Sequence, residues 1–240
     1  MSPETAQKII EENRALYDRI ADHFVQTRHK LWPDGLRIAD YIPKESRVLD
    51  VGCGSGRLFS LLRGKKCDYF GSDNSEHIIE AARNQYALQG AKFVVGSLTN
   101  IPCTDEYFDV VAMIASLHHI PSGQLQQTAL RECFRVLKPG GIFVMTVWNL
   151  EADYFKMKFN LADDSFIHPE KGLEKGDFFI PWKNDKGELL GNRFVHSFEM
   201  DELARLITSV GLSIQTMEYI KNGVATNKNG GSNILIVASK

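Results

Sequence analysis

A buried strand that runs directly into three closely spaced glycines constrains this chain more than any other feature. The apolar run 47–51 predicts the strand, and Gly52-Cys53-Gly54-Ser55-Gly56 follows it before helical residues resume. Glycines there let a nucleoside approach the bare backbone at the carboxyl edge of a parallel sheet. Asp73 ends the next predicted strand, where a carboxylate can accept both hydroxyls of a ribose. Together the loop and the acid predict a nucleoside site; the alternative is a simple tight turn, with Asp73 capping the next helix.

The spacing of this loop argues against a dinucleotide ligand. Its glycines follow the pattern G-x-G-x-G, and Arg57 stands where a dinucleotide fingerprint has its third glycine. The case for a bound pyrophosphate is weaker for that reason.

The rest of the chain alternates between predicted strands and helices. Apolar runs bounded by turn residues predict strands at 47–51, 68–72, 91–95, 108–115, 142–148, 213–219 and 233–238. Amphipathic spacing and capping residues predict helices from Ser2 to about Phe24, after Pro33, after Gly56, and over 75–88, 122–137 and 201–210. This alternation favours a parallel sheet covered by helices on both faces, that is, a doubly wound α/β fold. Residues 151–192 break the pattern, with mixed charge and little periodicity over a stretch too long for a plain connection.

Composition excludes several classes of protein. Lys and Arg total 28 against 30 Asp and Glu, so the formal net charge of −2 provides no overall field that attracts polyanions. The four cysteines are scattered without a C-x-x-C pair, which fits neither a zinc site nor a disulfide scaffold. The first residues lack a basic and apolar leader, and no apolar run reaches about eighteen residues. We therefore expect a cytoplasmic protein with reduced thiols, no metal site and no membrane segment.

Four motifs occur together at matching places in this alternation. They are Asp50-Val51-Gly52-Cys53-Gly54-Ser55-Gly56, Asp73, Phe108-Asp109 and Arg135-Val136-Leu137-Lys138-Pro139-Gly140-Gly141. Through them the chain resembles the class I S-adenosylmethionine-dependent methyltransferases. The resemblance implies a Rossmann-like methyltransferase fold with a mostly parallel, seven-stranded sheet, a helical N-terminal segment and an insertion after the fifth strand. We expect a single domain made of an N-terminal helical cap (1–45), a cofactor-binding core (46–150), a substrate-side insertion (151–196) and a C-terminal helix and strand pair (197–240).

The resemblance also implies S-adenosylmethionine as the cofactor. The glycine loop would pass under its methionine part, Asp73 would bind its ribose, and residues after the third strand would cradle its adenine. Many relatives carry an acid where Ser97 stands, so the adenine contact here would fall to Ser97 and Leu98. Tyr17 would reach the methionine part, or would merely pack within its helix. The full implied set is Tyr17, Asp50, Gly52, Cys53, Gly54, Gly56, Asp73, Asn74, Ser97, Leu98 and Ala115.

A second resemblance narrows the acceptor. The segments 17–24 and 27–33 are similar to those of the eukaryotic-type tRNA wobble-uridine carboxymethyl methyltransferases, a family that esterifies a carboxymethyl group on the wobble base. The similarity continues through Gly71-Ser72-Asp73, His118-His119, Val147-Trp148, 178–182 and 193–196. It implies the anticodon loop of a tRNA as substrate and a small zinc-binding activator protein as a partner.

A carboxylate acceptor suits the residues present. It is already deprotonated at neutral pH, so its methylation requires alignment and exclusion of water but no general base. Arg28 would hold the carboxylate as a bidentate partner, with Arg193 and His118 or His119 as further donors, and Trp148 would offer a face to the extruded base. Simpler alternatives exist for each: the arginines as surface charges, one of the adjacent histidines packing away from the cleft, and Trp148 in the core.

Other acceptors find less support. Residues 116–121 lack the Asn/Asp-Pro-Pro-aromatic motif that amino-group enzymes carry after the fourth strand. Pro102-Cys103 provides the dipeptide used in pyrimidine C5 methylation, but after the third strand instead of the fourth. Residues 227–233 replace the Asp-Asn-Trp-Trp-like stretch of the tRNA family, so the site wall built there differs.

Two further functions compete with tRNA methylation. One is a small-molecule O- or C-methyltransferase of the quinone or natural-product type, and the other is a cofactor-binding protein without catalysis. The net charge keeps the first of these open. Binding of tRNA would need a local basic patch or a partner, and basic residues do gather in two places, Arg28, Lys30 and Arg37, and Arg63, Lys65 and Lys66.

Overall fold

Eight strands form one central sheet. The structure is a computed structural model that describes residues 1–28, 32–159 and 172–240. The strand order is β3-β2-β1-β4-β5-β10-β8-β9, in which the first five strands are parallel and the last three pair antiparallel. The strands are β1 Arg47–Val51, β2 Asp68–Asp73, β3 Lys92–Val95, β4 Phe108–Ile114, β5 Leu137–Trp148, β8 Ser213–Lys221, β9 Val224–Thr226 and β10 Asn233–Ser239. The doubly wound, mostly parallel fold predicted from the sequence is thereby confirmed.

The eighth strand, β9, is the difference from the seven strands expected. It pairs with β8 through a two-residue loop, Asn222-Gly223, in which both residues have positive φ (52° and 77°). This is the geometry of a tight hairpin turn, and Asn-Gly is a favoured sequence for it. The dipeptide was a local signal for the extra strand that the apolar pattern of β9 itself, exposed at all three residues, did not give.

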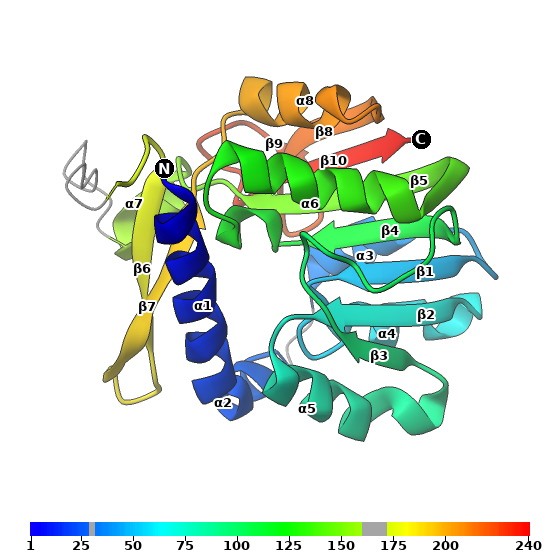
Figure 1. Cartoon of the computed structure of the whole chain (residues 1–240), viewed down its shortest axis with the longest axis horizontal. Helices are drawn as coiled ribbons and strands as arrows, with labels where there is room; N and C mark the ends of the chain where they lie inside the picture. The colour runs from blue at the N-terminus through cyan, green and yellow to red at the C-terminus, as the bar shows by residue number, and fades with distance from the viewer. Residues whose placement is uncertain (29–31, 160–171) are drawn as a thin grey trace.

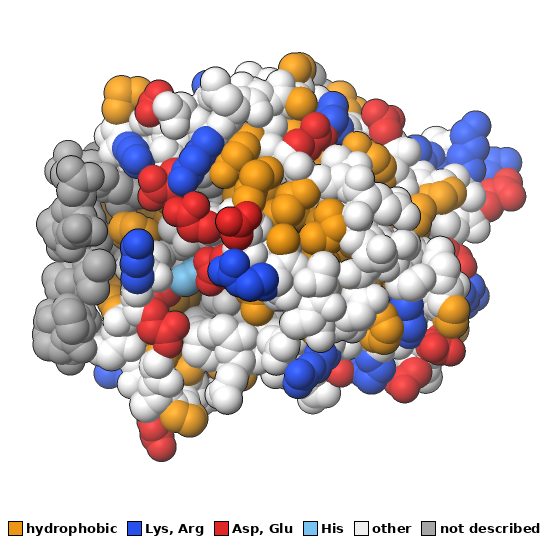
Figure 2. Space-filling view, turned by 90° about the horizontal axis from the view of Figure 1, so that it is seen from above, with side chains coloured by type: hydrophobic (Ala, Val, Ile, Leu, Met, Phe, Trp, Pro, Cys, Tyr) orange, Lys and Arg blue, Asp and Glu red, His pale blue; other side chains and the backbone are white. Residues whose placement is uncertain are grey.

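Helices cover both faces of the sheet, as Figure 1 shows. Side chains alternate along β4: Val111 and Met113 pack into the core beneath α6 and α8, whereas Val110 and Ala112 pack against α3 and α4. The helices that cover the sheet are α3 Pro33–Asp40, α4 Arg57–Leu62, α5 Glu76–Tyr86, α6 Gly123–Val136 and α8 Met200–Ser209. Of these, α5 lies beside β3. Seen from above (Figure 2), the outer surface mixes Lys and Arg with Asp and Glu around an apolar strip.

The N-terminal helix is divided into two. Ser2 caps α1 (Pro3–Arg19) by accepting a hydrogen bond from the amide of Thr5, as a serine before a first-turn proline favours. At Ile20 the backbone leaves helical geometry (φ −99°, ψ 8°), and a separate short helix, α2 (Ala21–Gln26), follows. The single helix predicted to about Phe24 is therefore broken, which turns α2 toward α5.

The region predicted to be irregular contains a helix and a hairpin. Helix α7 (Asp153–Phe159) follows β5, and β6 (Asp177–Lys183) pairs antiparallel with β7 (Leu189–His196) in a second, two-stranded sheet. The last four residues of β7 are all buried, including Arg193 and His196. Burial on both faces, with charged residues among the buried ones, hides the two-residue period by which strands are recognised in a sequence.

The hairpin stands beside α1 at the end of the molecule to which the parallel strands point (Figure 1). Asn13 of α1 joins the two: its Oδ1 accepts from the Phe194 amide at 2.8 Å, and its Nδ2 donates to the Phe194 carbonyl at 3.3 Å. Helix α1 and the hairpin thus form a wall opposite the carboxyl edge of the sheet.

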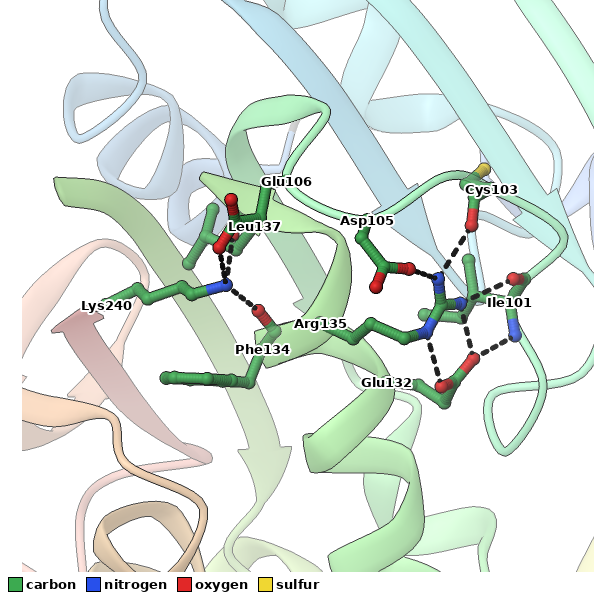
Figure 3. A network of polar contacts seen from close by, with 9 residues as sticks. All are labelled: Ile101, Cys103, Asp105, Glu106, Glu132, Phe134, Arg135, Leu137 and Lys240. Atoms are coloured by element: carbon green, nitrogen blue, oxygen red, sulfur yellow. Dashed lines mark hydrogen bonds and ion pairs between the residues drawn. The ribbon is translucent and has the colours of Figure 1, made fainter. Parts of the chain in front are cut away.

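Two basic residues fasten the opposite end of the sheet (Figure 3). Arg135 of α6 donates to the carboxylates of Glu132 and Asp105 and to the carbonyls of Ile101 and Cys103. This holds the connection between β3 and β4 against α6. Nearby, the Lys240 ammonium donates to the carbonyls of Phe134 and Leu137, which anchors the C-terminal residue, and pairs with Glu106.

A buried histidine ties the hairpin to α8. His196 of β7 is 6% exposed, and its two ring nitrogens lie 2.6 Å from Asp177 Oδ1 and 3.2 Å from Glu202 Oε1. Burial by itself opposes protonation, but the bonds to the two carboxylates outweigh it and raise the pKa of His196 to about 9. The group is therefore a buried cation at neutral pH.

The contacts of His196 with Asp177 and Glu202 should stabilise the fold less as the pH becomes alkaline. The folded pKa of His196 lies above its ordinary value of about 6.5, so the stabilisation is complete below about pH 6.5 and is lost as the pH rises through about 9. We expect the free energy of unfolding of the wild type to exceed that of a His196→Gln variant by on the order of 3 kcal/mol at pH 6, and the difference to vanish above pH 9. Urea unfolding at a series of pH values measures it. A constant difference between the two proteins over this pH range would refute this effect of the His196 contacts.

Candidate active site

A cavity of about 790 Å³ opens at the carboxyl ends of the parallel strands. One side is made by the loops after β1, β2 and β4, and the other by α1, α2, α7 and the β6–β7 hairpin. This is the edge at which ligands bind in open α/β sheets.

The glycine loop after β1 has a conformation that side chains would prevent. Gly52 has a φ of +73°, and a Cβ added to it would lie 2.3 Å from the Ser116 hydroxyl oxygen. The amides of Gly52 and Cys53 both donate to the Ser72 carbonyl, at 2.7 and 2.9 Å, and so join the loop to β2. Gly54, also at positive φ, faces the Phe24 ring. The loop therefore presents bare backbone to the cavity.

Asp73 closes this side at the end of β2. Its two carboxylate oxygens accept from the amides of Gly54 (2.9 Å) and Ser75 (3.1 Å), so it joins the glycine loop to the start of α5. Ser75 provides the actual helix cap, since its hydroxyl accepts from the Ile78 amide. Burial raises the pKa of Asp73, against the lowering effect of these amides. Asp73 thus both fixes the loop and lines the cavity.

Asp50 is a second buried acid in the cavity wall. Its Oδ2 accepts from the Tyr69 hydroxyl at 2.6 Å, whereas its Oδ1 has no hydrogen-bond partner within the described chain. Burial raises the pKa of Asp50 to about 7, a shift to which the neighbouring Asp73 adds. An orphaned carboxylate oxygen at this depth would be satisfied by a cationic group of a ligand.

A buried arginine dominates the other side. The guanidinium of Arg193, on β7, lies over the rings of Trp148 and Trp182, with its central carbon 4.6 and 4.8 Å from their centroids. Arg193 is 6% exposed, its Nε has no partner, and no carboxylate pairs with it among the described residues. Its one hydrogen bond among the described residues is to the Tyr17 hydroxyl, 3.5 Å from Nη1. The fold thus holds an unneutralised cation in the cavity wall.

His119 and Tyr17 lie beside this cation. His119 Nδ1 is 2.9 Å from the Phe194 carbonyl, which can only accept, so Nδ1 carries the proton. His119 Nε2 must then accept from the Tyr17 hydroxyl at 3.1 Å. Burial, with the nearby Arg193 charge, lowers the pKa of His119 to about 4. His119 is therefore neutral, with both ring nitrogens engaged.

His118 does not line the cavity. It is fully buried behind Trp148, whose amide donates to its Nδ1 and whose ring stacks on it at 4.9 Å. Burial lowers its pKa well below the ordinary range. The two histidines lie in a 3-10 turn (η3, Leu117–His119) and not in the extended segment expected, and their rings contact each other, with centroids 4.5 Å apart. Of the two, His119 is the one that lines the cavity.

Trp148 lines the cavity, but its ring is already engaged within the protein. His118 and Phe155 both stack on it, and the Arg193 guanidinium lies over it. These contacts hold the indole in place in the cavity wall. The role expected of Trp148, to offer a face to the extruded base, stays a prediction.

Arg28 lies between the two sides. Its guanidinium is 4.5 Å from the centroid of Phe24, the ring that packs on Gly54, and 5.9 Å from that of Trp182. Burial and then the Arg193 charge lower its pKa. Among the described residues Arg28 has no carboxylate partner. The neighbouring residues of its motif, 29–31, including Lys30 of the first basic cluster, lie outside the described chain.

The cavity brings together most of the residues selected from the sequence. Gly56, Ser97 and His118 do not line it, and Phe24, Asn13 and Trp182, which were not selected, do. The motif at 178–182 contains Trp182 and could have indicated it as a site residue, whereas no motif in the sequence indicated Asn13. The selected residues that line it are Tyr17, Arg28, Asp50, Gly52, Cys53, Gly54, Asp73, Asn74, Leu98, Ala115, His119, Trp148 and Arg193.

The segment before β10 also contributes to the wall. Ser232 and Asn233 line the cavity, although they differ from the aromatic stretch of the tRNA family. Asn233 Nδ2 donates to Asp34 at 2.8 Å, which joins this wall to α3.

Burial raises the pKa values of the Cys53 and Cys103 thiols, and Cys103 does not line the cavity. Over the described ranges, no three His, Cys, Asp or Glu side chains gather as metal ligands. Within the same ranges no helix is long and apolar enough to cross a membrane.

The hydrogen bonds of His119 predict an observable tautomer. We expect the imidazole of His119 to stay neutral with the proton on Nδ1 from pH 8 to pH 5, because its pKa is about 4. Side-chain ¹⁵N shifts measure this, with a His119→Asn variant to assign the signals. Protonation of His119 above pH 6 in the wild type would contradict the geometry, and Tyr17→Phe should change the environment of Nε2 alone.

The sequence of this chain is similar to those of known methyltransferases. A family described as a methyltransferase domain matches residues 49–145. A tRNA (carboxymethyluridine(34)-5-O)-methyltransferase of Arabidopsis thaliana is 33% identical over 152 residues, covering 63% of this chain and 35% of the relative, so the chain spans about a third of that protein's length. A putative methyltransferase of Encephalitozoon cuniculi is 32% identical over 199 residues, covering 82% of this chain and 85% of the relative.

Two solved structures share the fold. A methyltransferase of Methanosarcina mazei described as S-adenosylmethionine-dependent superposes with a TM-score of 0.68 at 24% identity, covering 88% of this chain and 98% of that one. A putative methyltransferase solved in complex with the Haloferax volcanii Trm112 methyltransferase activator gives a TM-score of 0.65 at 19% identity, covering 93% and 96%. The glycine cradle, the orphaned Asp50 oxygen and the buried Asp73 fit the cofactor of such enzymes. The chain belongs to the S-adenosylmethionine-dependent methyltransferases.

Proposed function

We propose that this enzyme transfers the methyl group of S-adenosylmethionine to the carboxylate of a carboxymethyl-modified wobble uridine in tRNA, forming a methyl ester. The observation that carries the proposal is Arg193, a buried cation without a carboxylate partner in the described chain, held against Trp148 and Trp182 in the cavity wall. A buried charge of this kind is costly unless a ligand neutralises it. A carboxylate is the ligand that matches its planar fork of donors.

The proposed cofactor site is the sheet side of the cavity. Asp73 would receive the ribose hydroxyls, the loop Gly52-Cys53-Gly54 would lie under the methionine part, and the free Oδ1 of Asp50 would face its amino group. Leu98 would pack on the adenine. Ser97, Gly56, Asn74 and Ala115 belong to the same proposed set, with Gly56 and Ser97 acting behind the lining residues.

The proposed reaction needs no proton transfer. The bound cofactor supplies an electrophilic methyl group on a sulfonium. An oxygen of the acceptor carboxylate forms the new O–CH₃ bond as the S–CH₃ bond breaks, its electron pair stays on sulfur, and the products are the ester and S-adenosylhomocysteine. His119 is neutral with both nitrogens engaged, so it is poorly suited to act as a base. This supports an acceptor that is already ionised. Arg28 and Arg193 would orient it, with Tyr17 and His119 between them.

Binding of tRNA would rely on a partner or on the cavity rim. In the two basic clusters of the sequence, Arg37 pairs with Glu218, and the Lys65 ammonium donates to the carbonyls of Ala39 and Ile42. Those cations are used within the fold. On the face in Figure 2, the described charges of both signs are interspersed. The Arabidopsis relative is named for tRNA, and the Haloferax neighbour was solved with an activator. We propose that a small activator protein supplies part of the RNA affinity here too.

The product of the reaction tests the proposal directly. Purified enzyme, with and without a candidate activator, is incubated with methyl-labelled cofactor and bulk tRNA from cells that lack the activity. We expect label in tRNA that mild base releases as methanol, because the bond formed is an ester. Label that resists base would indicate another position on the RNA. Absence of label in tRNA under both conditions would reject the proposal in favour of a small-molecule acceptor, and cofactor binding without any transfer would favour a non-catalytic role.

Substitutions should separate the two sides of the cavity. Asp73→Ala should weaken S-adenosylhomocysteine binding about 100-fold, because it removes a buried acceptor pair. Arg193→Lys and Arg28→Ala should instead lower kcat/KM for tRNA about 100-fold and leave that affinity nearly intact, because each loses the bidentate fork. Calorimetry and transfer kinetics measure both quantities, with Arg131→Ala on the exposed face of α6 as the control. Equal loss of cofactor affinity in Arg28→Ala would move Arg28 to the cofactor side.

A further inference from the structure

One indole lies close to both Arg193 and Arg28, the two arginines proposed to hold the acceptor. Trp182, near the end of β6, is 8% exposed and lines the cavity. The guanidinium carbons of Arg193 and Arg28 lie 4.8 and 5.9 Å from its centroid. The rings of Tyr17 and Phe24 pack on it at 6.4 and 6.0 Å. Trp182 is therefore the common neighbour of the acceptor-side cations.

The orientation of this indole is set by a histidine from another element. Trp182 Nε1–H donates to His23 Nδ1 of α2 at 2.9 Å. Because Nδ1 accepts, the His23 proton is on Nε2, which lies 3.4 Å from Asp185 Oδ1. A buried indole N–H without such an acceptor would lose a hydrogen bond. The bond to His23 therefore holds the Trp182 ring in this orientation.

Covering the face of a guanidinium restricts what it can bind. A cation–π contact occupies the flat face of a guanidinium and leaves the N–H groups at its edge able to donate in plane. In Arg193 one of these groups, on Nη1, is 3.5 Å from the Tyr17 hydroxyl. Two such donors match a coplanar carboxylate. They match a group without a planar pair of oxygens less well.

We propose that Trp182 is a specificity-determining residue, which holds Arg193 and Arg28 edge-on toward a planar carboxylate, and that His23 is its positioning residue. The proposal rests on the proposed function for the identity of the acceptor. Its geometric part, the coupling of His23 to Trp182, does not depend on the acceptor.

Kinetics with tRNA test the role in specificity. Trp182→Leu should lower kcat/KM roughly 30-fold, the effect of a desolvated cation–π contact, whereas the Kd for S-adenosylhomocysteine should change by less than about twofold. The matched control is Leu190→Ala, which removes packing from the same apolar cluster but lies over neither arginine. If Leu190→Ala loses as much activity as Trp182→Leu, Trp182 acts by packing alone. Parallel loss of S-adenosylhomocysteine binding would likewise overturn the proposal.

A mutant cycle tests the positioning role. Trp182→Phe keeps a ring but lacks the N–H, and His23→Leu lacks the acceptor; each should lower kcat/KM about fivefold, and the double variant should lose no more than either single one. His23→Asn keeps an acceptor near the place of Nδ1 and should restore activity to within about twofold of wild type. Additive losses, or equal activity of the Leu and Asn variants, would refute the coupling.

A measurement without substrate separates this inference from the proposed function. The chain has three tryptophans, so three indole N–H signals are expected in a ¹H–¹⁵N spectrum, and Trp182→Phe identifies the one that belongs to Trp182. That signal should move upfield in His23→Leu and stay near its wild-type position in His23→Asn. An unchanged signal in His23→Leu would refute the coupling even if tRNA is methylated. Conversely, if the signal moves but wild type labels no tRNA, the proposed function fails, the role in carboxylate specificity fails with it, and the coupling stands.

Discussion

A guanidinium kept out of water, with no carboxylate beside it in the described part of the chain, determines how the proposed acceptor side of this enzyme is built. Removing such a charge from solvent is costly, and the fold offsets the cost with the π faces of Trp148 and Trp182 and with the Tyr17 hydroxyl. Each of these groups then has to be held in turn. Trp148 is fixed by His118 and Phe155, Trp182 by His23, and Arg193 itself by the strand that Asn13 fastens to α1.

The two sides of the cavity differ in how the chain assembles them. The glycine loop, Asp50 and Asp73 come from adjacent strands of the parallel sheet, and short connections bring them together. The acceptor side joins α1, α2, the end of β5 and the hairpin, which are far apart in the sequence. The residues proposed to hold the cofactor therefore come from the sheet, and those proposed to select the acceptor come from segments added around it.

This difference explains what the sequence made predictable. The strand at 47–51 was predicted to the residue, and the loop and acid after it indicated the fold and the cofactor because their chemistry is local. The β6–β7 hairpin was missed because both of its faces bury charged side chains, Asp177 and His196 on one face and Arg193 on the other, which hide the apolar alternation. Which histidine lines the cleft, and which side chains pack on Trp148, depend on packing between distant segments. No spacing within one segment encodes either fact.

The bond between Asn13 and Phe194 spans 181 positions of the chain. Helix α1 precedes every strand of the sheet in the chain, yet the strand on which it docks follows all five parallel strands. During synthesis, the parallel strands and their glycine loop therefore emerge while the apolar face of α1 still lacks its partner. The wall made by α1 and the hairpin can close only afterwards.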